Sequence, residues 1–190
     1  MNAFGFYFLG DELSVDFCNT LLGATLPGES LELLENSSQL RNWYVTAKLL
    51  PTETKSKFAF KAALELRGAL REIYWGIQQH TAPAEPALEV LNRFLEQRHE
   101  RTQVRAEDAH FVLECVLEGP PDPAFKVAES AAYFLASFDR TRLKKCSNPS
   151  CDLLFYDRSK NNSRRWCEMQ TCGNRAKQSR FKARLLEPTD

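Results

Sequence analysis

The sequence predicts an α+β protein with a mainly helical N-terminal body, a small β-hairpin and a C-terminal four-cysteine finger. Three observations support this fold class. Apolar residues recur at helical spacing through much of the first 142 residues, one segment near residue 110 alternates, and four of the six cysteines lie within 27 residues. With 190 residues, the chain can hold a medium-sized domain and a small appendage. We therefore expect a body over residues 1–142 and a finger over residues 143–190.

Short elements open the predicted body. Residues 5–10 are typical of a strand that ends in a turn, and residues 13–22 of a short helix. The next helix is expected to begin near Ser37 and to end at Leu50, before a proline. The longest helical pattern follows and extends to about Gln79, with lysine and arginine between its apolar positions. These patterns make the body mainly helical.

The second half of the body contains the one strong β pattern. A helix is expected to continue toward His99, and residues 101–118 then alternate between apolar and polar side chains. This alternation predicts a β-hairpin that turns near Glu107 and Asp108. A proline-rich break follows, and a last helix is expected to reach about Arg142. The cysteine segment comes directly afterwards, so the two parts are expected to have a fixed orientation.

The net charge of zero hides an uneven distribution. Residues 139–184 contain thirteen Lys/Arg and four Asp/Glu, a net charge of +9, and the rest of the chain carries −9. Such asymmetry indicates that the basic part contacts nucleic acid or a membrane surface. No apolar run reaches the ~20 residues that span a bilayer, and the N-terminus lacks the basic start of a secretory signal. We therefore expect a cytoplasmic protein with no membrane partner.

Four cysteines form two Cys-x4-Cys pairs separated by fifteen residues. The pairs are Cys146 with Cys151 and Cys167 with Cys172. Paired thiolates that complete one tetrahedron are typical of a structural zinc site, and we expect one Zn²⁺. Disulfides would need an oxidising compartment, and an iron–sulfur cluster usually has tighter spacing among three of its cysteines. The remaining two cysteines stand alone among apolar neighbours and are expected in the core: Cys18 and Cys115.

The residues around the pairs predict a treble-clef-like arrangement. Residues 153–156 are typical of a strand, 159–163 of a turn and 164–167 of the return strand. Residues 175–185 after the last cysteine are typical of a helix, with Phe181 expected to pack on the body. The order is therefore pair, hairpin, pair and helix.

Cys172-Gly-Asn-Arg175, which follows the earlier cysteines, resembles the signature of the CGNR zinc finger. Leu13-Ser-Val-Asp-Phe-Cys-Asn-Thr20 is similar to the element that opens the ABATE domain, and residues 40–43 and 66–71 also fit that domain. The resemblance covers nearly the whole chain. It implies a bacterial, stress-induced transcriptional regulator in which the finger binds DNA.

The basic finger is a candidate surface for duplex DNA. Phosphate contacts require cations on one face, and they contribute affinity rather than sequence choice. The candidate contacts are Arg158, Lys160, Arg164, Arg165, Arg175, Lys177, Arg180 and Arg184. The alternative is a solvated basic helix that balances the acidic body, with Arg175 stacked on Trp166 or Tyr156.

Four residues of the body could line a pocket for a small polar effector: Asp16, Asn19, Trp43 and Arg67. The competing interpretation is that Asp16 forms a buried ion pair with an arginine and has only a structural role.

Three functions remain open: a DNA-binding regulator, a protein-interaction adaptor with a structural finger, and an enzyme with a pocket in the body. The sequence shows no nucleotide loop, nucleophile elbow, paired catalytic carboxylates or linked histidines, so we expect no enzymatic activity. A homodimer would match the two-fold symmetry of many operators, although no heptad repeat specifies one.

Overall fold

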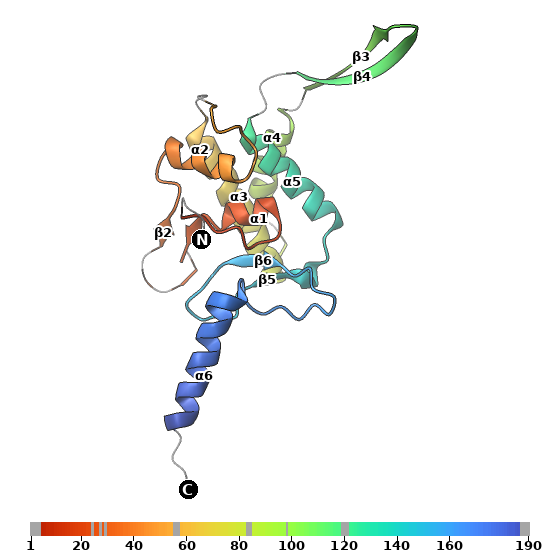
Figure 1. Ribbon diagram of the computed structural model, residues 1–190. Coiled ribbons are helices and arrows are strands. Elements are labelled where there is room, and N and C mark those ends of the chain that lie inside the picture. The colour runs from red at the N-terminus through yellow and green to blue at the C-terminus, as the bar shows by residue number, and fades with distance from the viewer. Residues whose placement is uncertain are drawn as a thin grey trace.

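The computed structural model describes residues 5–23, 25–26, 28, 30–54, 58–82, 85–97, 99–118 and 122–186, without the side chains of residues 99, 100, 117, 118 and 183–186. Figure 1 shows a helical body, a long hairpin that projects from one end of it, and a finger whose last helix extends from the other end. No helix within these ranges is long and apolar enough to cross a bilayer.

Within the described part of the body, five helices and one short strand pair form its structure. Asn36 caps the second helix by accepting hydrogen bonds from the backbone N–H groups of Ser38 and Gln39, so the helix begins where expected but with a different cap. Asp122 caps the fifth helix, whose first residue is a proline. The elements are α1 (Leu13–Cys18), β1 (Leu21–Leu22), β2 (Leu31–Glu32), α2 (Ser37–Thr46), α3 (Phe60–Gln78), α4 (Glu85–Leu95) and α5 (Pro123–Ser137).

Helix α3 is the centre of the body and contacts α1, α4 and α5. Its inward face buries Leu66, Leu70 and Ile73, which recur at helical spacing. Tyr74 on the same face shares a hydrogen bond of 2.6 Å with the hydroxyl of Ser14 in α1. The apolar pattern of the sequence therefore predicted the core-facing side of this helix correctly.

The predicted hairpin is confirmed. Strands β3 (His99–Glu107) and β4 (His110–Glu118) pair in antiparallel register, with Glu107 opposite His110 and Asp108 in the turn at a positive φ of 50°. Val104, Phe111 and Leu113 lie on one face and are 65%, 79% and 72% exposed. The expectation that Cys115 lies in the core is wrong, because this face points into solvent, whereas Cys18 is fully buried.

The finger begins with a 3₁₀ turn over Arg140–Arg142 and strand β5 (Leu143–Lys145), which pairs with β6 (Leu154–Tyr156). The expected return strand over residues 164–167 is wrong, since β6 pairs with the segment before the first cysteine. The first cysteine pair therefore lies in the loop that connects β5 to β6. A π-helical turn (Met169–Gly173) leads into helix α6 (Asn174–Leu186).

The finger is docked on the body through shared core residues. Leu143 and Leu154 are each only 1% exposed and belong to the same cluster as α3 and α5. Helix α6 instead extends away from this contact (Figure 1). The expectation that Phe181 packs on the body is wrong, because this side chain is 64% exposed.

Candidate metal centre and nucleic-acid interface

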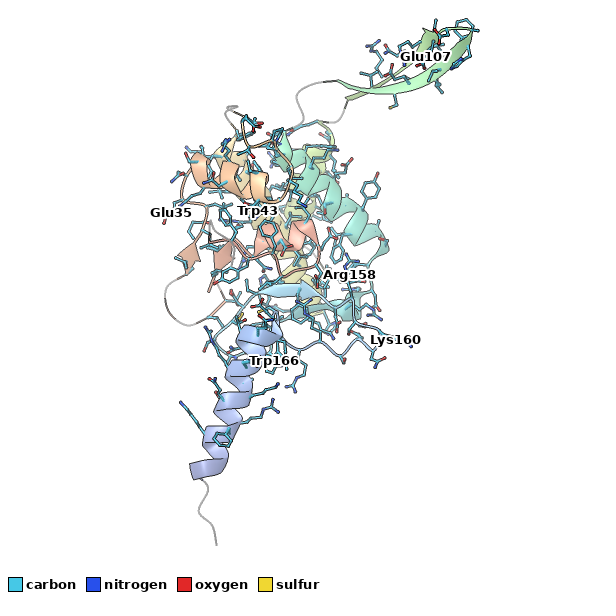
Figure 2. All side chains as sticks on the ribbon, in the orientation of Figure 1. Glu35, Trp43, Glu107, Arg158, Lys160 and Trp166 are labelled. Atoms are coloured by element: carbon cyan, nitrogen blue, oxygen red, sulfur yellow. The ribbon has the colours of Figure 1, made fainter. Side chains whose placement is uncertain are left out.

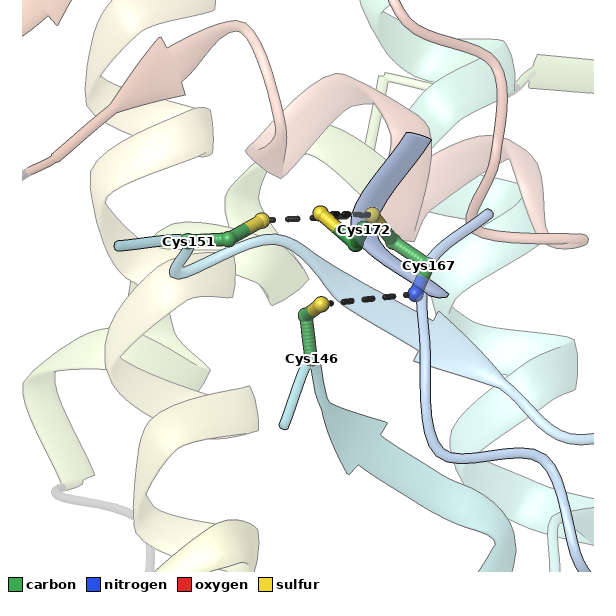
Figure 3. Close-up of side chains that lie close together, drawn as sticks. All are labelled: Cys146, Cys151, Cys167 and Cys172. Carbon is green, nitrogen blue, oxygen red and sulfur yellow. Dashed lines mark hydrogen bonds between the residues drawn. The ribbon is translucent and has the colours of Figure 1, made fainter. Parts of the chain in front are cut away.

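The four predicted cysteines come together at one point in the finger. Figure 3 shows their thiols directed toward one another. Cys146 follows β5, Cys151 lies in the loop before β6, Cys167 precedes the π-helical turn and Cys172 lies within that turn. All four sulfur atoms lie within 4.8 Å of one another, with 3.9 Å between Cys151 and Cys167 and 3.6 Å between Cys167 and Cys172. A tetrahedron with zinc–sulfur bonds of 2.3 Å has edges of about 3.8 Å, so this donor set fits Zn²⁺.

Local hydrogen bonds hold both cysteine pairs in place. The backbone N–H of Cys167 donates to the sulfur of Cys146 over 3.5 Å. In the first pair, the side chain of Asn148 accepts from the N–H of Ser150, and its carbonyl accepts from the N–H of Cys151. The N–H of Ser147 donates to the carbonyl of Arg165 and joins this loop to the chain that precedes the second pair. These contacts position the sulfurs from the backbone.

The proximity of the thiols determines their protonation. Hydrogen bonds with Cys151 and Cys167 lower the pKa of Cys146, and the hydrogen bond with Cys146 raises the pKa of Cys151. Hydrogen bonds with Cys146 and Cys151 raise the pKa of Cys167. The three thiols of Cys146, Cys151 and Cys167 therefore shift one another's pKa values, and a cation at the centre of the cluster would stabilise their thiolate forms.

The residues that follow the last cysteine have structural positions. A Cβ atom on Gly173 would overlap the sulfur of Met169 and lie 3.2 Å from Cδ1 of Trp166, so glycine permits this close approach. The side-chain amide of Asn174 donates to the carbonyl of Gln170 over 3.0 Å. Both residues thus stabilise the turn from which α6 begins.

A cationic groove runs between the first cysteine pair and helix α6. Its volume is about 570 Å³, and its walls include Arg165, Arg175, Arg180 and Lys182. The remaining described lining is Asn148, Pro149, Ser150, Trp166, Ala176, Gln178 and Ser179, and it contains no carboxylate. Four cations beside amide and hydroxyl groups form a surface that suits a chain of phosphates.

Three of the eight predicted nucleic-acid contacts lie together in this groove: Arg165, Arg175 and Arg180. Arg165 lies over the ring of Trp166, 5.3 Å from its centroid, whereas Arg175 makes no hydrogen bond, ion pair or ring contact within the described residues. Lys182, another cation of the terminal helix, also lines the groove, seven residues after Arg175 and therefore two helical turns along the same face.

Two of the predicted cations instead tie the finger to the body. Arg164 forms an ion pair with Asp11, donates to the carbonyl of Leu9 over 2.9 Å and lies over Phe155, 4.4 Å from the ring centroid. Arg158 donates twice to the carbonyl of Asp11, over 3.0 Å and 2.8 Å. These arginines therefore have structural partners that the charge pattern alone did not reveal.

The other three cations lie outside the groove lining or outside the described side chains. Figure 2 shows Lys160, like Arg158, on a part of the finger that lies away from the free end of helix α6. Lys177 is an exposed residue of α6 that does not line the groove. Arg184 belongs to α6, and its side chain lies outside the described ones.

The buried carboxylate of Asp157 fixes the loop between the two cysteine pairs. Burial acts to raise the pKa of Asp157, but hydrogen bonds from Lys144 and Ser159 hold it below its ordinary value. Lys144 donates to Asp157 over 2.7 Å, and the N–H of Arg164 donates to the same carboxylate over 2.8 Å. Lys144 is consequently a structural cation rather than an exposed one.

The four candidate effector ligands are buried and engaged in separate contacts. Asp16 accepts hydrogen bonds from the N–H groups of Leu9 and Gly10, and burial raises its pKa to about 7. The structure does not pair it with Arg67, which instead binds both oxygens of Glu32, over 2.7 Å and 2.5 Å. Arg67 also donates to the hydroxyl of Thr20 over 3.0 Å.

The other two candidates also contact the protein itself. Asn19 bonds to the backbone of Leu154, and Trp43 is fully buried, with its ring 5.7 Å from Phe8 and 4.8 Å from Phe17. Neither they nor Asp16 and Arg67 line the cationic groove, and the four do not meet around a described cavity.

The fold and the site define a two-part protein in which a four-thiolate metal finger is docked on a helical body. Comparison with protein families agrees with this class. The chain belongs to the ABATE family, described as "Putative stress-induced transcription regulator", whose family model matches residues 11–137. The CGNR zinc finger model matches residues 142–185 and includes all four cysteines. A search of curated proteins finds no match.

Proposed function

We propose that this protein is a DNA-binding transcriptional regulator whose cationic groove contacts the phosphates of duplex DNA. The groove carries the proposal: four cations lie along a continuous hollow, and no carboxylate occurs among its described lining residues. Cations placed in this way release counterions from the DNA and bind its backbone with little dependence on sequence. The regulator description of the family supports the same function.

The exposed helix α6 supports the proposal independently. Its described side chains are almost all polar and exposed, and a polar helix of 13 residues is marginal in water without a partner. Gln178 and Ser179 share the groove with the cations and can bond to base edges or to phosphate oxygens. A nucleic-acid duplex would give this helix the partner that the body does not provide.

We also propose that the four thiolates hold one structural Zn²⁺. Each cysteine contributes one ligand atom, which completes the tetrahedron and leaves no open position for a substrate. When bound, the ion would fix the first pair relative to the start of α6. It would thereby fix the two walls of the groove.

Binding of a labelled duplex, followed by fluorescence anisotropy, tests the DNA-binding function. Arg180→Gln combined with Lys182→Gln should weaken binding at least about tenfold, because each lost phosphate contact removes part of the affinity. Arg93→Gln is the matched control, because Arg93 is an exposed arginine of the body, 2.6 Å from Glu65. Equal affinity of the groove variant and the wild type would overturn the proposal.

Lys177→Gln distinguishes the effect of cations that line the groove from the effect of the general positive charge of helix α6. Lys177 lies on the same helix as Arg180 but does not line the groove, so its loss should weaken binding less than the loss of Arg180. Equal effects of the two substitutions would show that the helix contributes only its net charge.

A protein-interaction adaptor is the second candidate, and the projecting hairpin is the observation that favours it. The exposed face of Val104, Phe111 and Leu113 is typical of a surface that another protein covers. Capture of one specific partner that Phe111→Ser abolishes, by a chain with no affinity for DNA, would select this function.

A further inference from the structure

A second hollow, which shares Arg175 and Ser150 with the cationic groove, is lined by residues of both the body and the finger. It has a volume of about 310 Å³, within the range of sites for small organic ligands. Leu9 and Leu22 come from the body, Leu153 from the segment before β6, and Cys151 and Cys172 from the metal cluster. The hollow thus spans the contact between the two parts of the protein.

The walls of this hollow are mainly apolar, and its acidic residue is already neutralised. The carboxylate of Asp152 accepts from the N–H of Gly23 over 2.9 Å and from Thr25 over 3.3 Å, and it lies 3.8 Å from Arg71. Asp152 is 5% exposed, so these contacts satisfy a buried charge. Its carboxylate therefore does not require a cationic ligand.

Among the charged groups of the described lining, Arg175 alone has no partner within the part of the chain that the structure describes. It is exposed and makes no hydrogen bond, ion pair or ring contact with the described residues. Arg175 and Ser150 line both this hollow and the cationic groove, so they stand where the two hollows adjoin. A guanidinium and a hydroxyl at this position suit a carboxylate, which a guanidinium binds in a bidentate manner.

The thiolates of the metal cluster carry negative charge, which repels a carboxylate ligand. The segment that contains the cluster carries a net charge of +9. A head group beside Arg175 therefore lies in a positive region, with the hydrocarbon part against the leucines.

We propose that this hollow, the interface cavity, binds a small amphipathic carboxylate. The hydrocarbon chain contacts Leu9, Leu22 and Leu153, and the carboxylate pairs with Arg175. Binding requires both the body and the finger, because the apolar wall comes mainly from one and the arginine from the other.

Calorimetric titration of the zinc-loaded full chain with decanoate, below its micelle concentration, tests the proposal. Decanoate should bind at one site, and decan-1-ol and decylammonium should bind at least about tenfold more weakly, because they lack the group that Arg175 pairs with. Binding of either control compound as tightly as decanoate would overturn the assignment of Arg175, and absence of decanoate binding would overturn the site.

Three variants locate the binding. Arg175→Gln should weaken decanoate about tenfold, and Leu22→Trp, which fills the apolar wall, should abolish binding. Thermal unfolding confirms that each variant is folded, and Arg175→Gln, an exposed position, decides the outcome if Leu22→Trp is unstable. Phe111→Ser should leave binding unchanged, since this side chain belongs to the exposed hairpin face. Loss of decanoate binding in Phe111→Ser would place the ligand on the hairpin and contradict the proposal.

One consequence rests on the proposed function. Since Arg175 lines both hollows, a bound carboxylate and a DNA phosphate compete for it, and decanoate should weaken DNA binding several-fold in the wild type but not in Leu22→Trp. Equal weakening in both chains would contradict this competition. A chain that binds decanoate but no DNA would refute the proposed function and leave the interface cavity established.

Discussion

Asn19 in the body forms two hydrogen bonds with the backbone of Leu154 in the finger. Its Nδ2 donates to the carbonyl of Leu154 over 2.8 Å, and the N–H of Leu154 donates to its Oδ1 over 3.0 Å. Both residues are almost fully buried, so the side-chain amide satisfies two backbone groups that water does not reach. A single residue at the end of α1 thereby joins strand β6 to the body.

Asn19→Ala should destabilise the protein by about 2–4 kcal/mol, because it leaves a buried donor and a buried acceptor without partners. Urea unfolding measures this free energy, and Asn161→Ala at an exposed position is the control. A loss of less than about 0.5 kcal/mol would show that the two bonds contribute little to docking.

Removal of one metal ligand should unfold the finger. Cys167→Ser should reduce the bound zinc from one equivalent to a small fraction, with a lower melting temperature, because metal binding contributes the folding free energy of such modules. Elemental analysis and thermal unfolding give the two readouts. Cys115→Ser on the exposed hairpin is the matched control and should change neither. One full equivalent of zinc in Cys167→Ser would contradict the four-thiolate site.

Asp16 should make stability depend on pH. Its pKa is about 7 in the folded protein and about 3.9 when unfolded, so the folded state binds the proton more tightly. The contribution of Asp16 is fully present below pH ~4 and is lost as pH rises through 7. In Asp16→Asn, an amide oxygen can still accept from Leu9 and Gly10, while the buried charge is absent.

Relative to wild type, Asp16→Asn should therefore be more stable at pH 8 than at pH 4, with a free energy of unfolding larger by roughly 2 kcal/mol or more. Denaturant titrations at the two pH values measure this difference. Asp108→Asn in the hairpin turn is the control. The same difference between variant and wild type at both pH values would rule out a raised pKa.

Deletion of residues 176–190 should separate stability from DNA binding. The described part of α6 contacts the π-helical turn, and Phe181 is exposed, so the melting temperature should change by only a few degrees. DNA binding should be lost with Arg180 and Lys182. A large decrease in melting temperature would show that α6 packs on the rest of the protein.

The sequence predicted the elements whose pattern is local. The four cysteines and the hairpin over residues 101–118 follow from spacing and alternation alone, and both are confirmed. Strand pairing in the finger was predicted wrongly, because residues 143–145 and residues 164–167 could each pair with β6, and the choice depends on how Leu143 packs in the body. Short strands carry too little pattern to reveal such a contact.

The roles of individual charges could not be predicted from the sequence. Arg164 and Arg175 look alike in a basic segment, but Arg164 meets Asp11, 153 residues earlier, and Arg175 remains exposed. Arg67 likewise pairs with Glu32 rather than with Asp16. Such partners are brought together by the tertiary fold, which the charge pattern does not specify. Cys115 and Phe181 were expected to be buried because they are apolar. Only the tertiary fold shows that both are exposed.

The salt dependence of duplex binding by the zinc-loaded protein decides whether the groove binds the phosphates of DNA. Four groove cations that each neutralise one phosphate predict a log–log slope of about −3.5, and removal of Arg180 and Lys182 should reduce its magnitude by about 2. A measurable affinity with this slope would identify the groove as a phosphate-binding surface. An affinity that is undetectable at low salt, or that does not change with salt, would contradict the account.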